Sequence, residues 1–129
     1  EKPDFVDIHN PADVAKAVRV SIEDKAKEHF KLILLNTRNR IIGIFTVSIG
    51  TLNASLVHPR EVFRKAIQHA ASSVVLAHNH PSGNPEPSDD DIALTKRLCE
   101  SGRLLGIEVI DHIVVAKDEF VSFKARGLM

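Results

Sequence analysis

The side chains most able to do chemistry are two histidines and an aspartate in one short segment, His78, His80 and Asp91. The apolar run Val74–Ala77 before them predicts a buried strand. Side chains two apart on a strand share a face, so the two histidines can reach one ion together. The proline-rich segment 81–87 can return the start of the next expected helix, with Asp91, to the histidines.

Two imidazole nitrogens and one carboxylate oxygen form a ligand set that suits zinc, each at about 2.0–2.2 Å. Three protein ligands leave the fourth tetrahedral position to water, which is typical of catalytic zinc, whereas structural sites are closed. The sequence therefore predicts Zn²⁺ held by His78, His80 and Asp91 in a hydrolytic site.

Each of these residues also has a simpler interpretation. Histidines at a strand end can be solvated polar residues, and Ser88-x-x-Asp91 resembles a capping box that only begins a helix. Taken alone, Asp91 fits the capping role. The box usually ends in Glu or Gln, however, and the histidine pair, the rigid loop and the carboxylate occur together, which favours the metal site.

The elements expected around this segment alternate between helices and strands. We expect helices over residues 11–21, from 59 onward and over 88–101, and strands over 30–35, 41–48, 54–57, 73–80, 107–116 and 120–123. The inward helix positions are Val14, Ala17, Val18, Val62, Phe63, Ala66, Ile67 and Ala70. Gly102 is expected to stop the helix that Ser88 begins. This order predicts one mixed α/β sandwich domain over residues 1–129, and the start at Glu1 rather than Met predicts a piece of a longer chain.

Composition narrows the class of protein. The 17 basic and 17 acidic residues balance, and with six Phe and no Trp or Tyr the chain has few groups for base stacking, so nucleic-acid binding by this domain alone is not expected. The single cysteine, Cys99, excludes an internal disulfide and fits a reducing, cytoplasmic setting. No apolar run is long enough to cross a bilayer.

The pattern H-x-H, seven residues, S, two residues, D resembles the JAMM/MPN+ metallopeptidases, and more narrowly the bacterial RadC family. The matching segments are His78-Asn79-His80-Pro81-Ser82-Gly83, Pro87-Ser88, Gly50-Thr51-Leu52-Asn53, His58-Pro59-Arg60-Glu61 and Asp111-His112. The resemblance implies a mixed β-sheet wrapped by helices, as in cytidine-deaminase-like sandwiches. It also implies a zinc peptidase or isopeptidase whose substrate would be a peptide or protein conjugate.

Carried over by position, the resemblance makes His78, His80 and Asp91 the metal ligands and gives Ser88 the role of stabilising an oxyanion. It also implies an upstream glutamate as general base. Glu28 fits best, because it directly precedes the first strand. The competitors are Glu23, Glu61 and Glu108. The implied base takes a proton from zinc-activated water and returns it to the leaving amine.

Two questions stay open at this stage. Asp111-His112 can orient a ligand imidazole or form a structural pair, and we favour the structural pair; His9, His29, His58 and His69 are expected at the surface or its boundary. The competing functions are a scaffold without chemistry and a DNA-repair-associated domain. The substrate and the oligomeric state do not follow from the sequence.

Overall fold

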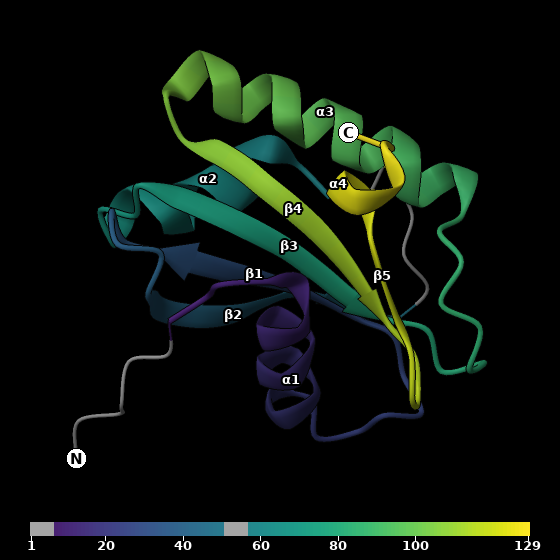
Figure 1. The fold of residues 1–129 in the computed structure, drawn as a ribbon. Helices are drawn as coiled ribbons and strands as arrows, with labels where there is room; N and C mark the ends of the chain where they lie inside the picture. The colour runs from purple at the N-terminus through teal and green to yellow at the C-terminus, as the bar shows by residue number, and fades with distance from the viewer. Residues whose placement is uncertain (1–6, 51–56) are drawn as a thin grey trace.

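The described residues form one five-stranded sheet with helices on both of its faces (Figure 1). The computed structural model describes residues 7–50 and 57–129. The strands are β1 (His29–Leu35), β2 (Ile41–Ile49), β3 (Ser73–Asn79), β4 (Glu108–Val115) and β5 (Phe120–Ser122). The helices are α1 (Pro11–Ser21), α2 (Pro59–Gln68), α3 (Asp89–Leu105) and α4 (Phe123–Arg126). The mixed α/β class expected from the sequence is confirmed.

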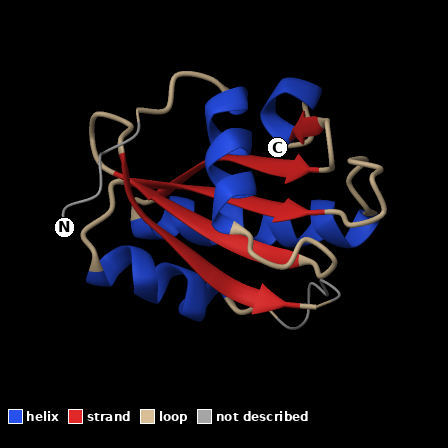
Figure 2. Cartoon of the chain, turned by 90° about the horizontal axis from the view of Figure 1, so that it is seen from below, coloured by secondary structure: helices blue, strands red, loops and turns tan. Residues whose placement is uncertain are grey.

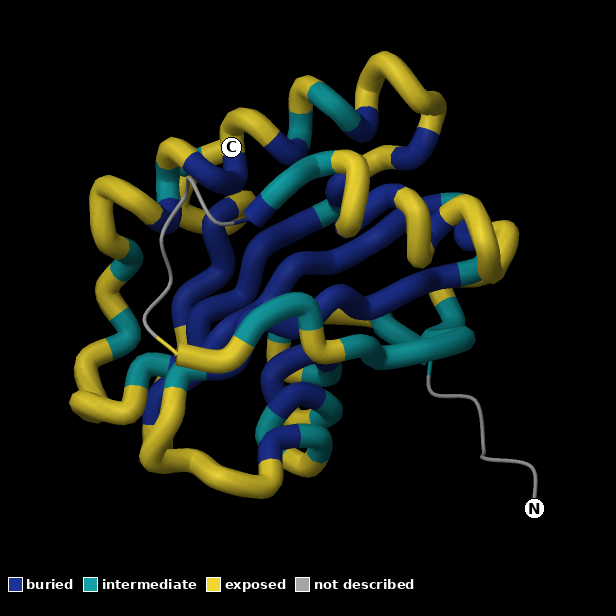
Figure 3. Tube along the Cα trace, turned by 180° about the vertical axis from the view of Figure 1, so that it is seen from behind, coloured by how far each residue is buried: buried dark blue, intermediate teal, exposed yellow. Residues whose placement is uncertain are grey.

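The sheet is mixed in direction and has the order β2-β1-β3-β4-β5. Strand β1 is antiparallel to β2 and β3, β3 is parallel to β4, and β4 is antiparallel to β5. The parallel pair needs a crossover, which α3 provides over one face of the sheet. Strands β1 and β3 are buried along their whole length, as Figure 3 shows, so both faces of these central strands are covered by packed side chains.

Alternating residues of β1 and β3 build a separate apolar core on each face. On the face covered by α2 and α3 the core contains Phe30, Leu32, Leu34, Val57, Val62, Phe63, Ala66, Ala71, Val74, Leu76, Leu94, Leu98, Ile107 and Val109. On the opposite face, crossed by α1 in Figure 2, it contains Val14, Ala15, Val18, Ile22, Ile33, Leu35, Val75, Ala77, Ile113 and Val115. His78 continues the first series on β3, so it points toward α3.

Several sequence expectations need correction. Helix α3 continues through Gly102 and ends at Gly106, whose φ of 74° is the left-handed cap conformation. Gly102 is instead buried inside the helix, against Phe63. In α2, Ile67 is 59% exposed, and Ala70 lies beyond the helix end with a φ of 52°.

The other outcomes concern smaller elements. Helix α4 was not expected. In α1, Val14 and Val18 are buried as expected, but the third buried residue is Ala15, and Ala17 is only half-buried. The strand expected over 54–57 lies outside the described residues except for Val57, which is in no strand. No described helix has the length and hydropathy needed to cross a membrane.

Candidate metal and catalytic site

His78 and His80 lie where β3 leaves the sheet. His78 pairs in register with Phe30 of β1 and is completely buried, which places its imidazole over the α2–α3 face. His80 follows the last residue of the strand, and its backbone N–H donates to the Val115 carbonyl at 2.8 Å, so the parallel pairing with β4 still holds the backbone there. Both imidazoles therefore extend from a fixed main chain.

Asp91 reaches the histidines from the first turn of α3. Its N–H donates to the Ser88 hydroxyl at 3.1 Å, while its Oδ2 accepts from the Ser88 N–H at 2.8 Å, so the capping box is present. The same Oδ2 atom lies 3.3 Å from Nε2 of His78 and 3.3 Å from Nε2 of His80. The two interpretations of Asp91 are compatible, because the cap fixes the carboxylate beside the imidazoles.

The three atoms form a small triangle with the dimensions of one face of a zinc tetrahedron. The third side, between Nε2 of His78 and Nε2 of His80, is 2.9 Å. Ligand atoms at about 2.0–2.2 Å from a tetrahedral zinc lie about 3.3–3.6 Å from one another. Two sides of the triangle fall in that range and the third is slightly short, so His78, His80 and Asp91 can bind one divalent cation with little movement.

Hydrogen-bond partners fix the tautomers of both histidines. Nδ1 of His80 lies 2.9 Å from the Asn84 carbonyl, which can only accept, so this nitrogen carries the proton. For His78, Nδ1 lies 2.8 Å from Nε2 of His112. The Thr95 hydroxyl donates to the Asp91 carbonyl at 2.8 Å and lies 2.5 Å from Nδ1 of His112.

The hydroxyl has one hydrogen, which the Asp91 carbonyl takes, so Thr95 must accept from Nδ1–H of His112. Neutral His112 then accepts at Nε2 from Nδ1–H of His78. Both His78 and His80 therefore direct an Nε2 lone pair at the same point as the Asp91 carboxylate. Three acceptors that converge with no hydrogen between them need a cation, either a metal ion or a proton.

The ionisation of the surrounding groups agrees with that requirement. Burial would raise the pKa of Asp91, but when a proton is the bound cation, hydrogen bonds from His78 and His80 outweigh burial and hold this pKa far below its usual value. The hydrogen bond with Asp91 raises the pKa of His80. Burial lowers the pKa of His112 well below its ordinary value, which keeps this imidazole neutral. A negative site with neutral support is one that a cation stabilises.

Glu28 joins this cluster from the position just before β1, the strand that pairs with β3. One carboxylate oxygen of Glu28 and one nitrogen each of His78 and His80 all lie within 4.8 Å of one another. Glu28 stands two residues before Phe30, so it shares the face on which His78 and His80 lie. The half-buried carboxylate is close enough to reach a ligand or water at the triangle.

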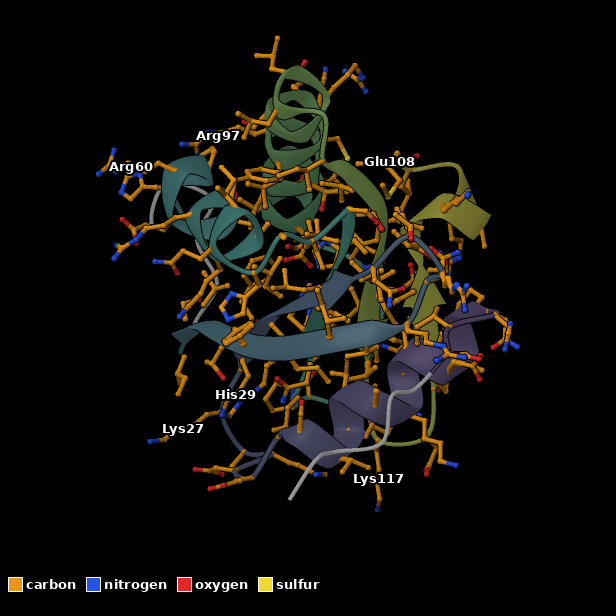
Figure 4. All side chains as sticks on the ribbon, turned by 90° about the vertical axis from the view of Figure 1, so that its left-hand side faces the viewer. Lys27, His29, Arg60, Arg97, Glu108 and Lys117 are labelled. Carbon is orange, nitrogen blue, oxygen red and sulfur yellow. The ribbon has the colours of Figure 1, made fainter. Side chains whose placement is uncertain are left out.

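The competing glutamates lie elsewhere. Glu23 and Glu61 are exposed, and Glu61 instead faces Arg64 at 3.8 Å. Glu108 begins β4, at the opposite end of the sheet from His80, and is labelled in Figure 4. Of the candidates named from the sequence, the structure brings only Glu28 to the histidines.

Ser88 lies at the mouth of the site. Its Oγ accepts from the Asp91 N–H, and within the described part of the chain no acceptor takes its O–H proton. The residue is exposed at the N-terminus of α3, where backbone N–H groups and the helix dipole favour negative charge. The hydroxyl can donate to an oxygen that approaches the triangle.

The remaining histidines correct two expectations. His112 orients His78 rather than forming only a structural pair, whereas Asp111 is structural, since its carboxylate accepts from Ser122 Oγ and the Lys124 N–H. His29 is 7% exposed, so it is not a surface residue. His9, His58 and His69 are half-buried or exposed, as expected.

The sequence reasoning missed Thr95. The available signal was its position four residues after Asp91, which places both on one side of α3.

The likeness to known proteins covers almost the whole chain. A sequence model described as RadC-like JAB domain matches residues 8–128. The chain belongs to the RadC-like JAB domain family. Its relatives include UPF0758 proteins of Desulforamulus reducens, 51% identical over 122 residues, and of Caldanaerobacter subterraneus, 49% identical over 120 residues. The resemblance inferred from the motif is confirmed.

These RadC-like relatives are longer proteins. The match covers 95% of this chain and 54% of the D. reducens protein, and 93% of this chain and 52% of the C. subterraneus protein. A UPF0758 protein of Bacillus cereus, 50% identical over 120 residues, shows the same proportion, with 53% of its length covered. The JAB domain described here thus corresponds to about half of each relative.

Proposed function

We propose that this domain is a zinc-dependent hydrolase that cleaves peptide or isopeptide bonds, with His78, His80 and Asp91 as the metal ligands. One observation carries the proposal. Three acceptor atoms from these residues lie 2.9–3.3 Å apart with lone pairs directed at a common point, and the Glu28 carboxylate lies beside them. A site built only to cap α3 needs neither the two imidazoles nor the second carboxylate.

Zinc bound at this triangle would supply a water whose pKa falls to about 7, together with a positive charge that polarises a carbonyl. The protein supplies the acid–base chemistry. Glu28 is placed to accept a proton from water and to return it to the leaving amine, because no described side chain ties its carboxylate in a hydrogen bond. Half-burial limits the water that competes for that proton.

Ser88 is proposed to stabilise the oxyanion that develops on the substrate carbonyl. Its hydroxyl keeps a free proton, and the N-terminus of α3 adds a positive dipole end at the same place. Removal of one such donor typically lowers kcat by about 10²–10³ fold. The capping bond fixes the oxygen of Ser88 while leaving the donor function available.

The alternatives remain a scaffold without chemistry and a domain associated with DNA repair. A scaffold has no need for a neutral, tautomer-fixed imidazole behind a ligand histidine, and this chain has one in His112. The balanced charge gives no polyanion-binding excess, so we propose that this domain alone does not bind nucleic acid. The substrate is proposed to be a peptide or protein conjugate in a reducing, cytoplasmic compartment.

The test combines metal content with turnover. The zinc-loaded chain should contain one zinc per molecule and hydrolyse members of a fluorogenic peptide and isopeptide library. Glu28→Gln should retain the zinc and lose hydrolysis by at least about 10² fold, the typical contribution of a general base. Glu23→Gln, an exposed glutamate of the same connecting segment, serves as the matched control and should hydrolyse normally.

Two outcomes would contradict the proposal. A chain that binds no stoichiometric zinc after loading would rule out the zinc hydrolase function and favour a scaffold. Full activity in Glu28→Gln would keep the hydrolase function but show that Glu28 is not the general base.

A further inference from the structure

Asn79, the residue between the two proposed ligand histidines, bonds to the main chain on both sides of Glu28. Its Oδ1 accepts from the His29 N–H at 2.7 Å, and its Nδ2 donates to the Lys27 carbonyl at 3.0 Å. These partners fix the orientation of the amide, because an N–H can only donate and a carbonyl can only accept. Asn79 is only 6% exposed, so water does not compete strongly for either bond.

The Asn79 side chain replaces backbone hydrogen bonds at the place where the pairing between β1 and β3 stops. The antiparallel register ends with Phe30 opposite His78, and its continuation would place Lys27 opposite residue 81. In a regular antiparallel ladder the N–H of that residue would donate to the Lys27 carbonyl. Residue 81 is proline and has no N–H. The Asn79 amide supplies the missing donor and also the acceptor for His29.

The main chain around Glu28 is also hydrogen-bonded on its other side, toward β2. The Gly50 N–H donates to the Glu28 carbonyl at 2.8 Å, from the end of β2. The main chain around Glu28 is therefore bonded on both sides, although Glu28 stands just outside β1. In Figure 4 the side chains of Lys27 and His29 lie on the α1 side of the sheet, opposite to the face of Glu28.

We propose that Asn79 is a positioning residue that holds the carboxylate of Glu28 beside the metal ligands. This inference rests on the proposed function, in which Glu28 is the base. No described side chain bonds to the Glu28 carboxylate, so its place depends on the main chain that carries it. The run His78-Asn79-His80 thus serves both the metal ligands and the base. The two histidine side chains bind the metal on one face of the sheet, and the Asn79 side chain on the other face fixes the main chain that carries Glu28.

The first measurement needs no metal and no substrate. Amide hydrogen exchange followed by NMR should show the His29 N–H exchanging about tenfold or more faster in Asn79→Ala, because its acceptor is gone. The matched control is Asn36→Ala. Asn36 also accepts two backbone N–H groups with its side chain, from Arg38 and Arg40, but at the other end of β1. The control should leave the His29 amide protected.

The second measurement reports the distance between the Glu28 carboxylate and the bound metal. In the cobalt-loaded chain, the carboxyl carbon of Glu28 should relax fast because the paramagnetic ion is near. Asn79→Ala should still bind one cobalt but slow this relaxation severalfold, since the effect falls steeply with distance, whereas Asn36→Ala should not change it. Asn79→Asp keeps an acceptor for the His29 N–H but sets a second acceptor against the Lys27 carbonyl, so the His29 amide should stay protected while the Glu28 relaxation still slows. This variant replaces the alanine variant if that fails to fold.

The outcomes separate the two proposals. Unchanged Glu28 relaxation in both Asn79 variants, with normal cobalt binding, would overturn the positioning role and leave the hydrolase intact. Slow Glu28 relaxation already in the unmodified cobalt-loaded chain would instead remove Glu28 from the metal site, and with it both the base and its positioning. A chain that binds no cobalt would overturn the proposed function itself.

Discussion

Nδ1 of His78 lies 2.8 Å from Nε2 of His112, and this contact decides which nitrogen of His78 faces Asp91. His112 is completely buried and stacks on Phe123 with ring centroids 4.4 Å apart, so it has little freedom to turn away. Metal-bound histidines commonly donate their second N–H to such a partner, which fixes the ring and its tautomer. Here the partner is a second imidazole, whose own tautomer is set by Thr95.

Thr95→Val tests this chain of hydrogen bonds with little change in side-chain shape. The variant removes the acceptor for Nδ1–H of His112, so His112 no longer has one preferred tautomer. We expect zinc affinity, measured by competition with a chromophoric chelator, to fall by about 10–100 fold, as for other outer partners of metal ligands. Thr46→Val, a similar change on β2, should bind zinc normally. Equal affinity in both variants would show that Thr95 does not act on the metal.

The two roles of the α3 N-terminus can be separated by substitution. Ser88→Ala removes the N-cap acceptor and should lower the free energy of unfolding by about 1 kcal/mol while zinc stoichiometry stays at one. Asp91→Asn should lose zinc, because it replaces the charged ligand with a neutral amide. Chemical denaturation and elemental analysis measure the two effects. Loss of zinc from Ser88→Ala with a native fold would mean that the cap and the ligand position cannot be separated.

The sequence predicted the convergence of His78, His80 and Asp91 better than it predicted the end of α3. The common face of His78 and His80 followed from strand periodicity, because side chains two residues apart on a strand point the same way. The support from Thr95 did not follow, since it depends on how α3 packs across β4, which is a tertiary relationship. The predicted end of α3 at Gly102 was wrong for a similar reason. A glycine near a helix end can serve either as a cap or as a point of close packing, and the sequence does not distinguish the two.

Gly102→Ala tests that second use. A β-carbon at Gly102 would lie 2.3 Å from the Ile107 carbonyl oxygen and 3.1 Å from the Phe63 ring, so the start of β4 or the helix must shift. We expect unfolding free energy to fall by about 1–3 kcal/mol, the usual cost of overpacking. The measurement is urea denaturation, with Ser101→Ala on the same turn of α3 as control. A variant as stable as the control would show that the backbone relaxes without cost.

His80 should make the metal-free chain sensitive to pH. Its pKa is raised, first by the hydrogen bond with Asp91, so the folded chain binds this proton more tightly than the unfolded chain does. The stabilisation is therefore fully present below the ordinary histidine pKa of about 6.5 and disappears as the pH rises through the raised value. With chelator present, the melting temperature should fall by a few degrees across that interval.

His80→Gln should reduce this dependence, because glutamine binds no proton in that range, while His9→Gln, an exposed histidine with a side chain 76% accessible, should leave it unchanged. Zinc should reverse the trend, because it competes with the proton for Nε2 of His80 and binds better as the pH rises. The melting temperature of the metal-free chain could instead stay constant over this interval, or fall equally in His80→Gln. Either result would contradict the idea that His80 and Asp91 share a proton when no metal is bound.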